Sequence, residues 1–341
     1  MEMWQPDYEG VFFLQDRASG FKAIIAIDNT KLGPALGGCR MWQYDNDEAA
    51  INDALRLAKG MTYKNAISGL RYGGGKAVIL SHPKQGPRDG LLRMLGRYID
   101  RLQGHYITGM DLGTTVADMD RIRETTSYVT DVSGSLGAVN DLTATMTAYG
   151  VYLGIRAALK RVFGMESVLG RTVAVQGLGK VGFRLCRYLR EAGAYLVVTD
   201  IDEARVKLAA LEFGAATITP QAIFSVPCDV FAPCALGGIL NDDILSRLDC
   251  RIVAGAANNQ LAEPRHGDEL RKLGILYAPD YVINAGGIIV TGSELGGGDA
   301  VEAKRNVENI YGTLMKVFQS ATVSGLSTAA AADRMAENLL K

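Results

Sequence analysis

Hydrophobic and polar positions follow different patterns in the two halves of the chain. In the first half, two early apolar runs predict strands, and the second is apolar enough to be buried on both faces. Between Asp47 and Lys59 the apolar residues recur at every third or fourth position, which is typical of an amphipathic helix. The expected elements are strands over 11–14, 23–27, 77–80 and 106–108 and helices over 47–59 and 91–102. This half is therefore expected to be an α/β domain.

In the second half, strand-like and helix-like patterns alternate strictly after a helix over 148–162. The expected strands are 172–176, 196–199, 230–232, 251–254 and 281–283. Such alternation is typical of a doubly wound parallel sheet, the Rossmann arrangement. The tail from 299 to 340 has helical spacing, with one break at Ser324-Gly325.

These patterns predict two domains, 1–140 and 141–320, with a cleft between them. The last helix, about 321–341, is expected to pack back on the first domain. We expect the hinge near 134–147, where Gly134, Gly137 and Asn140 interrupt the pattern.

Composition narrows the class of partner. The chain has 341 residues, enough for about two domains with buried cores. Its 36 Lys and Arg against 37 Asp and Glu give a net charge of −1, so no global field recruits nucleic acid or an anionic membrane. A small molecule is the expected partner.

Cysteine usage and the N-terminal pattern bear on location. The five cysteines are odd in number and lack metal-site spacing, so we expect reduced thiols and no metal. The first residues show neither a basic stretch nor an apolar one, and no run of about 18 apolar residues occurs in the sequence. The expectation is a soluble, cytoplasmic protein.

A glycine-rich segment carries the most specific motif. In Val173–Gly182 the spacing of Gly177, Gly179 and Gly182 follows a predicted strand and opens a predicted helix, and Asp200 ends the next apolar run. Such glycines permit a tight turn, close approach of backbone to a pyrophosphate, and close packing of helix on strand. The motif predicts a dinucleotide site, although a glycine-rich strand-to-helix turn without a ligand has the same spacing. Its residues are Gly177, Leu178, Gly179, Lys180, Val181, Gly182 and Asp200.

Two lysines in the first half are candidates for acid/base chemistry. Lys64 lies in the segment 60–66 and Lys76 follows the glycines 73–75. A lysine that transfers protons near neutral pH needs a lowered pKa, which burial and a second ammonium group nearby would produce. The alternative is that both are solvated surface lysines, as most lysines are.

Three further segments have two interpretations each. Asp111 follows a predicted strand and is either an active-site carboxylate or a helix N-cap. The segment 32–38 offers backbone N–H groups to a carboxylate, or is a plain turn. Asn284 follows a predicted strand, where its amide could pair with a nicotinamide carboxamide. The histidines lie in no catalytic motif, and His82 and His266 are expected at the surface.

Seven segments in collinear order resemble the Glu/Leu/Phe/Val amino-acid dehydrogenase superfamily, and most closely its leucine dehydrogenase members. They span 33–38, 60–66, 73–79, 110–120, 147–152, 175–182 and 284–287. The resemblance implies a homo-oligomeric enzyme that catalyses the reversible, NAD-dependent oxidative deamination of an L-amino acid to a 2-oxo acid and ammonia.

The resemblance also implies roles for individual residues. Lys64, with Gly37, Gly38 and Met61, would bind the substrate. Lys76 would be the acid/base that activates water against the imine, and Asp111 would assist proton transfer at the amino group. The nicotinamide amide would be held by Thr147 and Asn284, and the adenine ribose by Asp200, whose charge would disfavour NADP.

Substrate choice is expected to depend on a side-chain pocket, by analogy lined by Leu36, Gly109, Ile288 and Thr291. None of the four is a cation, which disfavours a glutamate side chain, because its carboxylate would be buried without a partner. Aliphatic substrates (leucine, valine or isoleucine) are favoured. Gly109 would enlarge the pocket and Thr291 would make it more polar, which leaves phenylalanine and tryptophan open.

Two departures from the family pattern stand out. Met110 replaces an acidic residue that many relatives carry before the aspartate, and the linker 140–146 lacks the usual proline. Two rival hypotheses remain: a non-catalytic NAD(H)-binding sensor, and a hydroxy-acid dehydrogenase, which would need a histidine base.

Overall fold

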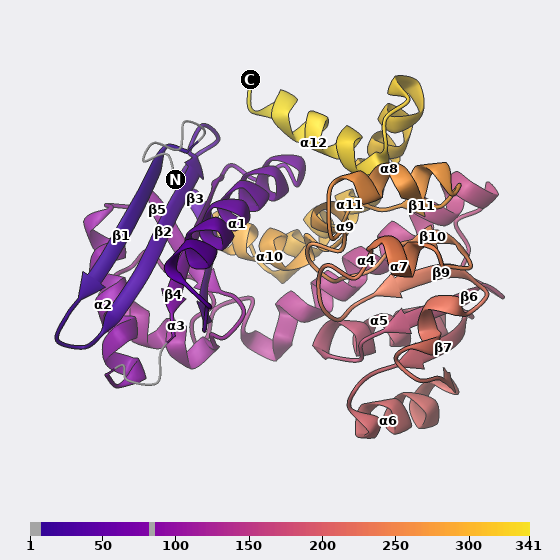
Figure 1. Ribbon diagram of the computed structural model, residues 1–341, viewed down its shortest axis with the longest axis horizontal. Helices are drawn as coiled ribbons and strands as arrows, with labels where there is room; N and C mark the ends of the chain where they lie inside the picture. Colours follow the sequence, from indigo (N-terminus) through magenta and orange to yellow (C-terminus); the bar gives the residue numbers. More distant parts are fainter. Residues whose placement is uncertain (1–7, 82–85) are drawn as a thin grey trace. The chain divides into compact units, whose positions relative to one another are not determined.

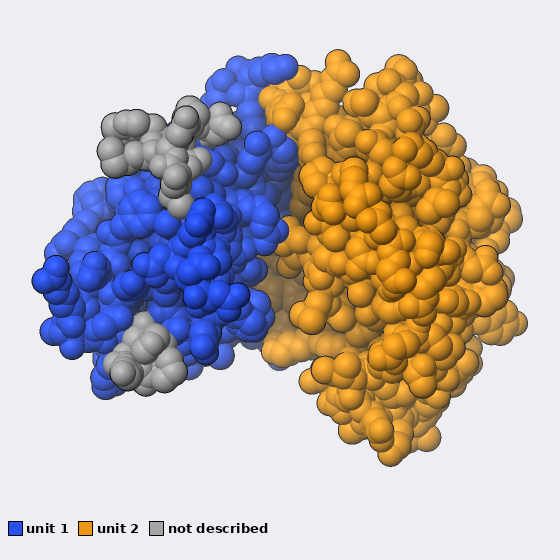
Figure 2. Space-filling model, viewed as in Figure 1, with its two compact units in different colours: residues 1–140, 294–297, 339–341 blue, residues 141–293, 298–338 orange. Residues whose placement is uncertain are grey.

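The computed structural model describes residues 8–81 and 86–341. The chain forms two compact units (Figure 2). Unit 1 comprises residues 1–140, 294–297 and 339–341, and unit 2 comprises 141–293 and 298–338. The chain therefore passes between the units at four points. His82, expected at the surface, lies outside the described residues.

Unit 1 is built on a mixed five-stranded sheet (Figure 1). Its strands are β1 (Gly10–Asp16), β2 (Phe21–Asn29), β3 (Ala35–Trp42), β4 (Gly73–Leu80) and β5 (Tyr106–Met110), in the order β1-β2-β4-β3-β5. The pairs β1–β2 and β2–β4 are antiparallel, whereas β3 pairs in parallel with both β4 and β5. This register puts the carboxyl ends of β3, β4 and β5 at one edge of the sheet.

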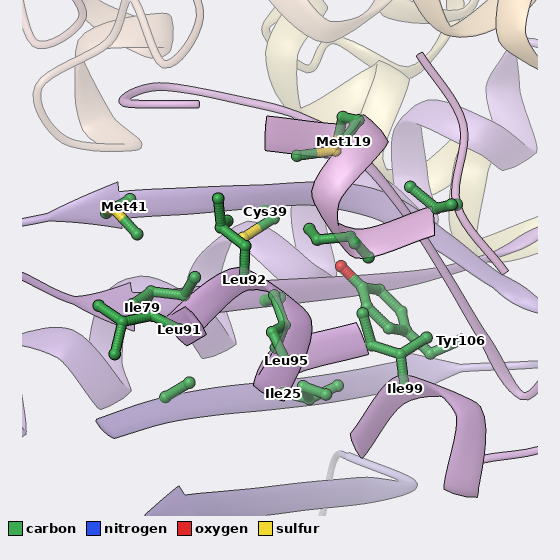
Figure 3. Close-up of a cluster of buried hydrophobic side chains, with 14 of the residues drawn as sticks. Ile25, Cys39, Met41, Ile79, Leu91, Leu92, Leu95, Ile99, Tyr106 and Met119 are labelled. Atoms are coloured by element: carbon green, nitrogen blue, oxygen red, sulfur yellow. The ribbon is translucent and has the colours of Figure 1, made fainter. Parts of the chain in front are cut away.

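Helices cover both faces of this sheet. Helix α1 (Asp47–Ile67) packs its alanine-rich side against one face, in a cluster with Ile24, Ala26 and Val78. Helices α2 (Arg88–Arg101) and α3 (Val116–Arg123) cover the other face, where Leu92, Leu95, Ile99 and Met119 pack against Ile25, Cys39, Ile79 and Tyr106 (Figure 3). Consecutive residues of β2 thus contribute to opposite cores, as expected for a strand buried on both faces.

All the expected elements of unit 1 are present, but two segments differ from the prediction. Gly37 and Gly38 lie inside strand β3 rather than in a turn. A Cβ atom at Gly37 would overlap the carbonyl oxygen of Gly75, so close approach of strands β3 and β4 requires glycine there. Helix α1 continues to Ile67 and includes Lys64, although Gly60 weakens the helical pattern.

Unit 2 contains an all-parallel, six-stranded sheet. The strands are β6 (Thr172–Gln176), β7 (Tyr195–Thr199), β8 (Ala216–Thr217), β9 (Cys228–Pro233), β10 (Cys250–Val253) and β11 (Leu276–Tyr277), in the order β11-β10-β9-β6-β7-β8. The chain runs outwards from β6 through β7 to β8 and then returns to β9 on the other side of β6. The doubly wound prediction is confirmed, and the switch point, where such sheets bind ligands, lies at the carboxyl end of β6.

The helices of unit 2 are α4 (Leu142–Phe163), α5 (Lys180–Glu191), α6 (Glu203–Phe213), α7 (Asp242–Leu245), α8 (Arg265–Lys272), α9 (Asp280–Ile283), α10 (Gly286–Leu295), α11 (Ala300–Ser324) and α12 (Thr328–Leu339). Short 3₁₀ turns occupy Val139–Asp141 and Ala222–Ser225. The last residues of α10 belong to unit 1. The predicted break in the tail is confirmed at Gly325, which has a φ of 70°.

One predicted strand is wrong. Residues 281–283 form helix α9, and the last strand is the two-residue β11 just before it. A short apolar run does not distinguish a strand from one turn of buried helix, and here Ile283 packs against Gly154 of α4. Asn284 therefore follows a helix and not a strand.

Four further features bear on the sequence predictions. His266 is buried, with 1% of its surface exposed, so its expected surface position is wrong. Only residues 339–341 of the tail belong to unit 1, so the predicted docking of 321–341 stays a prediction. The five cysteines, Cys39, Cys186, Cys228, Cys234 and Cys250, are free thiols. None of the described helices is long and apolar enough to cross a membrane.

Candidate catalytic and dinucleotide sites

An ion pair between a buried lysine and a partly buried aspartate lies on the α1 side of the first sheet. Lys76 of strand β4 is 4% exposed, and its Nζ is 3.0 Å from Oδ2 of Asp111, which follows strand β5. Strand β3 runs between β4 and β5, so the pair forms across it. A Cβ atom at Gly38 of β3 would lie 2.9 Å from Cβ of Asp111, so glycine leaves the room that the carboxylate occupies.

Arg40, which the sequence interpretation missed, extends this pair into a network. Its Nε donates to Oδ2 of Asp111 at 2.9 Å, and its Nη1 donates to Oδ2 of Asp53 in α1 at 2.8 Å. Asp53 also accepts from the Tyr44 hydroxyl at 2.6 Å and from Arg56 at 2.7 Å. Arg40 is two residues past Gly38 on one strand, so both residues lie on the same face of the sheet. This alternation could have identified Arg40 from the sequence.

The network fixes the charge of Asp111. Burial alone would raise the pKa of its carboxyl, but the neighbouring cations Lys76 and Arg40 outweigh burial and hold the pKa below its usual value. Asp111 is therefore an ionised acceptor placed between an ammonium and a guanidinium group. It caps no helix: the N-cap of α3 is Thr115.

The end of helix α1 packs tightly on the glycines of the sheet. The side-chain amide of Asn65 donates to the carbonyl oxygens of Gly73 at 2.6 Å and Leu36 at 3.2 Å. A Cβ atom at Gly37 would be 3.2 Å from Cγ of Met61. The structure thus brings Met61 to Gly37 and places Lys64 in the last turn of the same helix. Proximity of the Lys64 and Lys76 ammonium groups stays a prediction.

Gly109 does not face open space. Residues 128–130 run beside β5, joined to it by hydrogen bonds from Thr108 N to Tyr128 O and from Thr130 N to Thr108 O. A Cβ atom at Gly109 would lie 2.6 Å from both Thr130 Oγ1 and Asp131 Oδ2. The expectation that this glycine enlarges a pocket is therefore wrong, because these two side chains fill the room.

Asp131 is a second acidic group that the sequence interpretation missed. It has a φ of 57°, and its Oδ2 accepts from the backbone N–H of Met110 at 2.9 Å. Burial raises the pKa of its carboxyl, and the charge of Glu294 raises it further. Asp131 and Asp111 thus lie on either side of Met110 with pKa values moved in opposite directions.

The other predicted pocket residues lie on different units. Leu36 is fully buried in β3 of unit 1, while Ile288 and Thr291 lie on α10 in unit 2. The Thr291 hydroxyl donates to the carbonyl oxygen of Gly287 at 3.3 Å. A shared pocket of these residues stays a prediction.

The glycine loop of unit 2 joins β6 to α5, at the switch point of its sheet. Gly177 has a φ of 96°, and a Cβ atom at Gly182 would overlap the carbonyl oxygen of Gly177. A Cβ atom at Gly179 would meet no described atom within 4 Å. The first and third glycines are thus required by folding, whereas the second leaves exposed backbone at the start of α5, where N–H groups and the helix dipole favour an anion. Leu178, Lys180 and Val181 complete the turn.

Polar groups surround this loop. Oδ2 of Asp200 accepts from Leu178 N at 2.5 Å and Oδ1 accepts from Asp202 N at 2.9 Å, so this carboxylate ties the loop to the end of β7. The Lys180 ammonium donates to Asp141 at 2.8 Å. The buried Thr199 hydroxyl and Gln176 Oε1, on paired residues of β7 and β6, have no hydrogen-bond partner among the described residues. Open backbone and unsatisfied polar atoms fit a dinucleotide.

The two residues assigned to the nicotinamide lie close together in unit 2. A Cβ atom at Gly287 would be 3.2 Å from Oγ1 of Thr147, which donates to Thr143 O at 2.8 Å. Asn284 Nδ2 donates to Ala256 O at 3.1 Å and to Asn258 Oδ1 at 2.7 Å. These bonds fix the orientation of the Asn284 amide before any ligand binds.

Comparison with known proteins defines the class of enzyme. The family described as "Glu/Leu/Phe/Val dehydrogenase, dimerisation domain" matches residues 11–128, and "Glutamate/Leucine/Phenylalanine/Valine dehydrogenase" matches 137–204 and 195–338. The protein is therefore an amino-acid dehydrogenase. It belongs to the Glu/Leu/Phe/Val dehydrogenase family, which confirms the resemblance seen in the sequence.

Individual relatives narrow the comparison. The chain is 52% identical to a leucine dehydrogenase of Bacillus subtilis strain 168 over 98% of this chain and 92% of the relative. It is 46% identical to a valine dehydrogenase of Streptomyces albus, over 98% and 92%. The crystal structure of L-tryptophan dehydrogenase from Nostoc punctiforme superposes with a TM-score of 0.86 at 45% identity, covering 98% of this chain and 96% of that one. Leucine dehydrogenase is the most similar of these three.

Proposed function

We propose that this protein catalyses the reversible, NAD-dependent oxidative deamination of an aliphatic L-amino acid, leucine, valine or isoleucine, to the 2-oxo acid and ammonia. The observation that carries the proposal is the ion pair between the buried Lys76 and the partly buried Asp111 beside Gly38. It occurs in a chain that is 52% identical to a leucine dehydrogenase.

In this proposal Lys76 is the acid/base and Asp111 its partner. Lys76, as the free amine, takes a proton from the water as its oxygen bonds to the imine carbon, and returns this proton to the amino group, which leaves as ammonia when the C–N bond breaks. Asp111, held ionised by two cations, accepts hydrogen bonds from the amino group that is lost. Lys64, helped by Gly37 and Gly38, binds the substrate carboxylate, and Met61 contacts the substrate. A cation is suited to hold a carboxylate.

The cofactor in this proposal is NAD, which supplies the hydride acceptor. Gly177, Leu178, Gly179, Lys180, Val181 and Gly182 hold its pyrophosphate, and Thr147 and Asn284 hold the nicotinamide amide. Asp200 accepts from the adenine ribose and repels a 2′-phosphate. The open backbone at Gly179 supports this assignment, as do the unsatisfied atoms of Thr199 and Gln176.

The proposal also covers the oligomeric state, the location and the metal requirement of the enzyme. The first matching family describes residues 11–128 as a dimerisation domain, which supports a homo-oligomer. We also propose a cytoplasmic enzyme that uses no metal, on the basis of its free thiols and balanced charge.

An aromatic substrate is the second candidate. It is favoured by the likeness to L-tryptophan dehydrogenase and by the polar Thr291 hydroxyl. The aliphatic proposal is preferred because Thr130 and Asp131 fill the space beside Gly109, which removes the extra room that a ring would need.

The test is a substrate panel, read as NADH formation at alkaline pH. We expect kcat/KM to be highest for leucine, valine or isoleucine and at least about tenfold lower for phenylalanine and tryptophan, since differences of pocket volume give factors of this size. Glutamate should be inactive. A preference for tryptophan would establish the aromatic alternative. Tight NADH binding with no turnover on any amino acid would instead indicate a sensor.

A further inference from the structure

Unit 2 contains a cavity that none of the roles above uses. Its volume is about 440 Å³, within the usual size range for small-molecule sites. It lies where α4 and α11 end and α12 begins, next to α8, β10 and the edge strand β11 (Figure 1). Strands β10 and β9 separate β11 from β6, the strand that carries the glycine loop. This cavity is therefore distinct from the dinucleotide site.

Three guanidinium groups line this cavity, each from a different element. Arg161 comes from the last turn of α4, Arg251 from β10 and Arg271 from α8. Arg161 donates to Thr322 Oγ1 at 3.0 Å. Within the described residues, the guanidinium groups of Arg251 and Arg271 have no hydrogen-bond or ion-pair partner. No Asp or Glu is among the described residues of the cavity wall.

Helix dipoles do not account for all of this charge. Helices α4, α8 and α11 end at the cavity, and the carboxyl end of a helix carries about half a negative charge. These three ends would supply about −1.5, and the amino end of α12, which begins at the cavity, about +0.5, against the three positive charges of the arginines. The remainder, about +2, matches an anion with one or two charges.

Apart from Thr322 and Thr328, the other side chains of the wall are mainly apolar. Val162, Phe318 and Leu326 line it together with Ile275 and Tyr277, and the rings of Phe318 and Tyr277 are almost fully buried. An inorganic ion would leave the partly exposed side chains of Val162 and Leu326 in contact with water. A ligand with an anionic head and a compact apolar part would cover them.

We propose that this cavity binds a small anionic ligand, an organic phosphate or carboxylate with one compact apolar group. Guanidinium groups bind such oxyanions through paired, charge-assisted hydrogen bonds, and Arg251 and Arg271 are available for them. This ligand binds together with the dinucleotide, because the cavity lies beside β10 and β11 whereas the glycine loop lies at the carboxyl end of the central strand β6. This inference does not depend on the proposed amino-acid substrate.

The test is isothermal titration of the full-length protein, saturated with NAD so that the glycine loop is occupied. Phenyl phosphate and phenylacetate are the probes, since both join an oxyanion to a ring and differ in the oxyanion. We expect binding of at least one probe, and a dissociation constant about tenfold larger in Arg251→Gln and in Arg271→Gln. Arg305→Gln, at an exposed arginine of α11 outside the cavity, should leave binding unchanged.

Three outcomes would overturn the proposal. One is no binding of either probe to the NAD-saturated protein. Another is equal binding by all three variants and the parent protein, which would mean adventitious anion binding elsewhere. The third is a changed oligomeric state in Arg251→Gln or Arg271→Gln, measured by sedimentation, which would mean that the cavity is covered by a second copy. Turnover of the amino-acid panel is measured separately, so failure here leaves the proposed reaction intact.

Discussion

Lys76 is a buried cation whose described partner is Asp111. Lys76→Ala should reduce kcat by at least about 100-fold, because a general acid/base contributes that much or more. NADH binding, which uses unit 2, should be unchanged in fluorescence titrations. Lys59→Ala is the matched control, because Lys59 is an exposed lysine of the same unit 1, and this variant should retain full activity. An equal loss of NADH binding would make Lys76 a structural residue.

Arg40 joins Asp111 to Asp53, and its removal tests the charge network. Arg40→Gln should lower the free energy of unfolding by about 2 kcal/mol near neutral pH, since two charge-assisted hydrogen bonds are lost. The folded-state pKa of Asp111 is lowered, so its contribution to stability is present above the unfolded pKa and disappears as the pH falls through the folded pKa. The difference between Arg40→Gln and the parent protein should therefore shrink in acid.

Urea unfolding at about pH 7 and about pH 3 measures both effects. Arg56→Gln is the control, because it removes an exposed hydrogen bond to Asp53 and leaves Asp111 untouched. A difference for Arg40→Gln that is the same at both pH values would show that the network does not set the charge of Asp111.

Asp131 should respond to pH with the opposite sign. Its folded-state pKa is raised, so its stabilising effect is complete below the unfolded pKa and is lost as the pH rises through the folded pKa. Asp131→Asn keeps an oxygen for the Met110 N–H and removes the charge. The variant should therefore gain stability relative to the parent protein between acid and neutral pH. Unfolding in urea at several pH values is the measurement, and a constant difference would contradict it.

The sequence identified the candidate catalytic residues but not the side chains that contact them. Lys76 and Asp111 stood beside glycines and at a strand end, which are local signals. Arg40 and Asp131 act through contacts with distant parts of the chain: Arg40 reaches helix α1, and Asp131 covers Gly109 from a segment 22 residues later. No local pattern encodes such contacts. Gly109 was misinterpreted for the same reason, because a glycine in sequence does not say what fills the space beside it.

At the scale of elements, different glycines of the loop serve folding and binding. Gly179→Ala should leave the melting temperature unchanged, because its Cβ would meet no described atom within 4 Å. Its NADH affinity should nevertheless fall by about tenfold or more, which is on the order of the loss of one phosphate hydrogen bond. Gly182→Ala should instead lower stability by about 1–3 kcal/mol, since its Cβ would overlap the Gly177 carbonyl oxygen.

Thermal unfolding and NADH titration of both variants form the test. Each variant serves as the control for the other, because the two substituted glycines lie only three residues apart in the same loop. Unchanged NADH affinity in Gly179→Ala would mean that the pyrophosphate does not approach this backbone.

Long elements were predictable and short ones were not. The periodic helices α1, α2, α4 and α11 and the apolar strands β2, β6 and β7 have enough residues to show their spacing. Helix α9 has four residues and strand β11 two, so neither completes a pattern, and the apolar run at 281–283 was assigned to the wrong class. Strand β3 was missed because its glycines resemble a turn until the neighbouring strand is known.

At the scale of the whole molecule, the chain passes between the two units at four points. We expect the units to unfold together for this reason, so a ligand of unit 2 should also protect unit 1. In a Trp4→Phe background, the fluorescence of Trp42, the last residue of strand β3, reports on unit 1. NAD at about 100 times its dissociation constant should stabilise the protein by about 2.7 kcal/mol in this signal.

Circular dichroism of the same samples follows unit 2 as well. Coincident transitions that shift together with NAD would support joint unfolding. If NAD moved only the circular dichroism transition, the units would be independent despite the four crossings.

The state of the thiols has a practical consequence for the whole protein. Burial raises the pKa of Cys39, Cys228, Cys234 and Cys250 to about 12, and it raises the pKa of Cys186 as well. The thiolate is the form that reacts with alkylating reagents, so these five should label very slowly at neutral pH. A cysteine placed at exposed Lys59 would then be the fast-reacting thiol. The natural sequence is thus already a suitable background for attaching a single fluorophore or spin label, with no native cysteine removed.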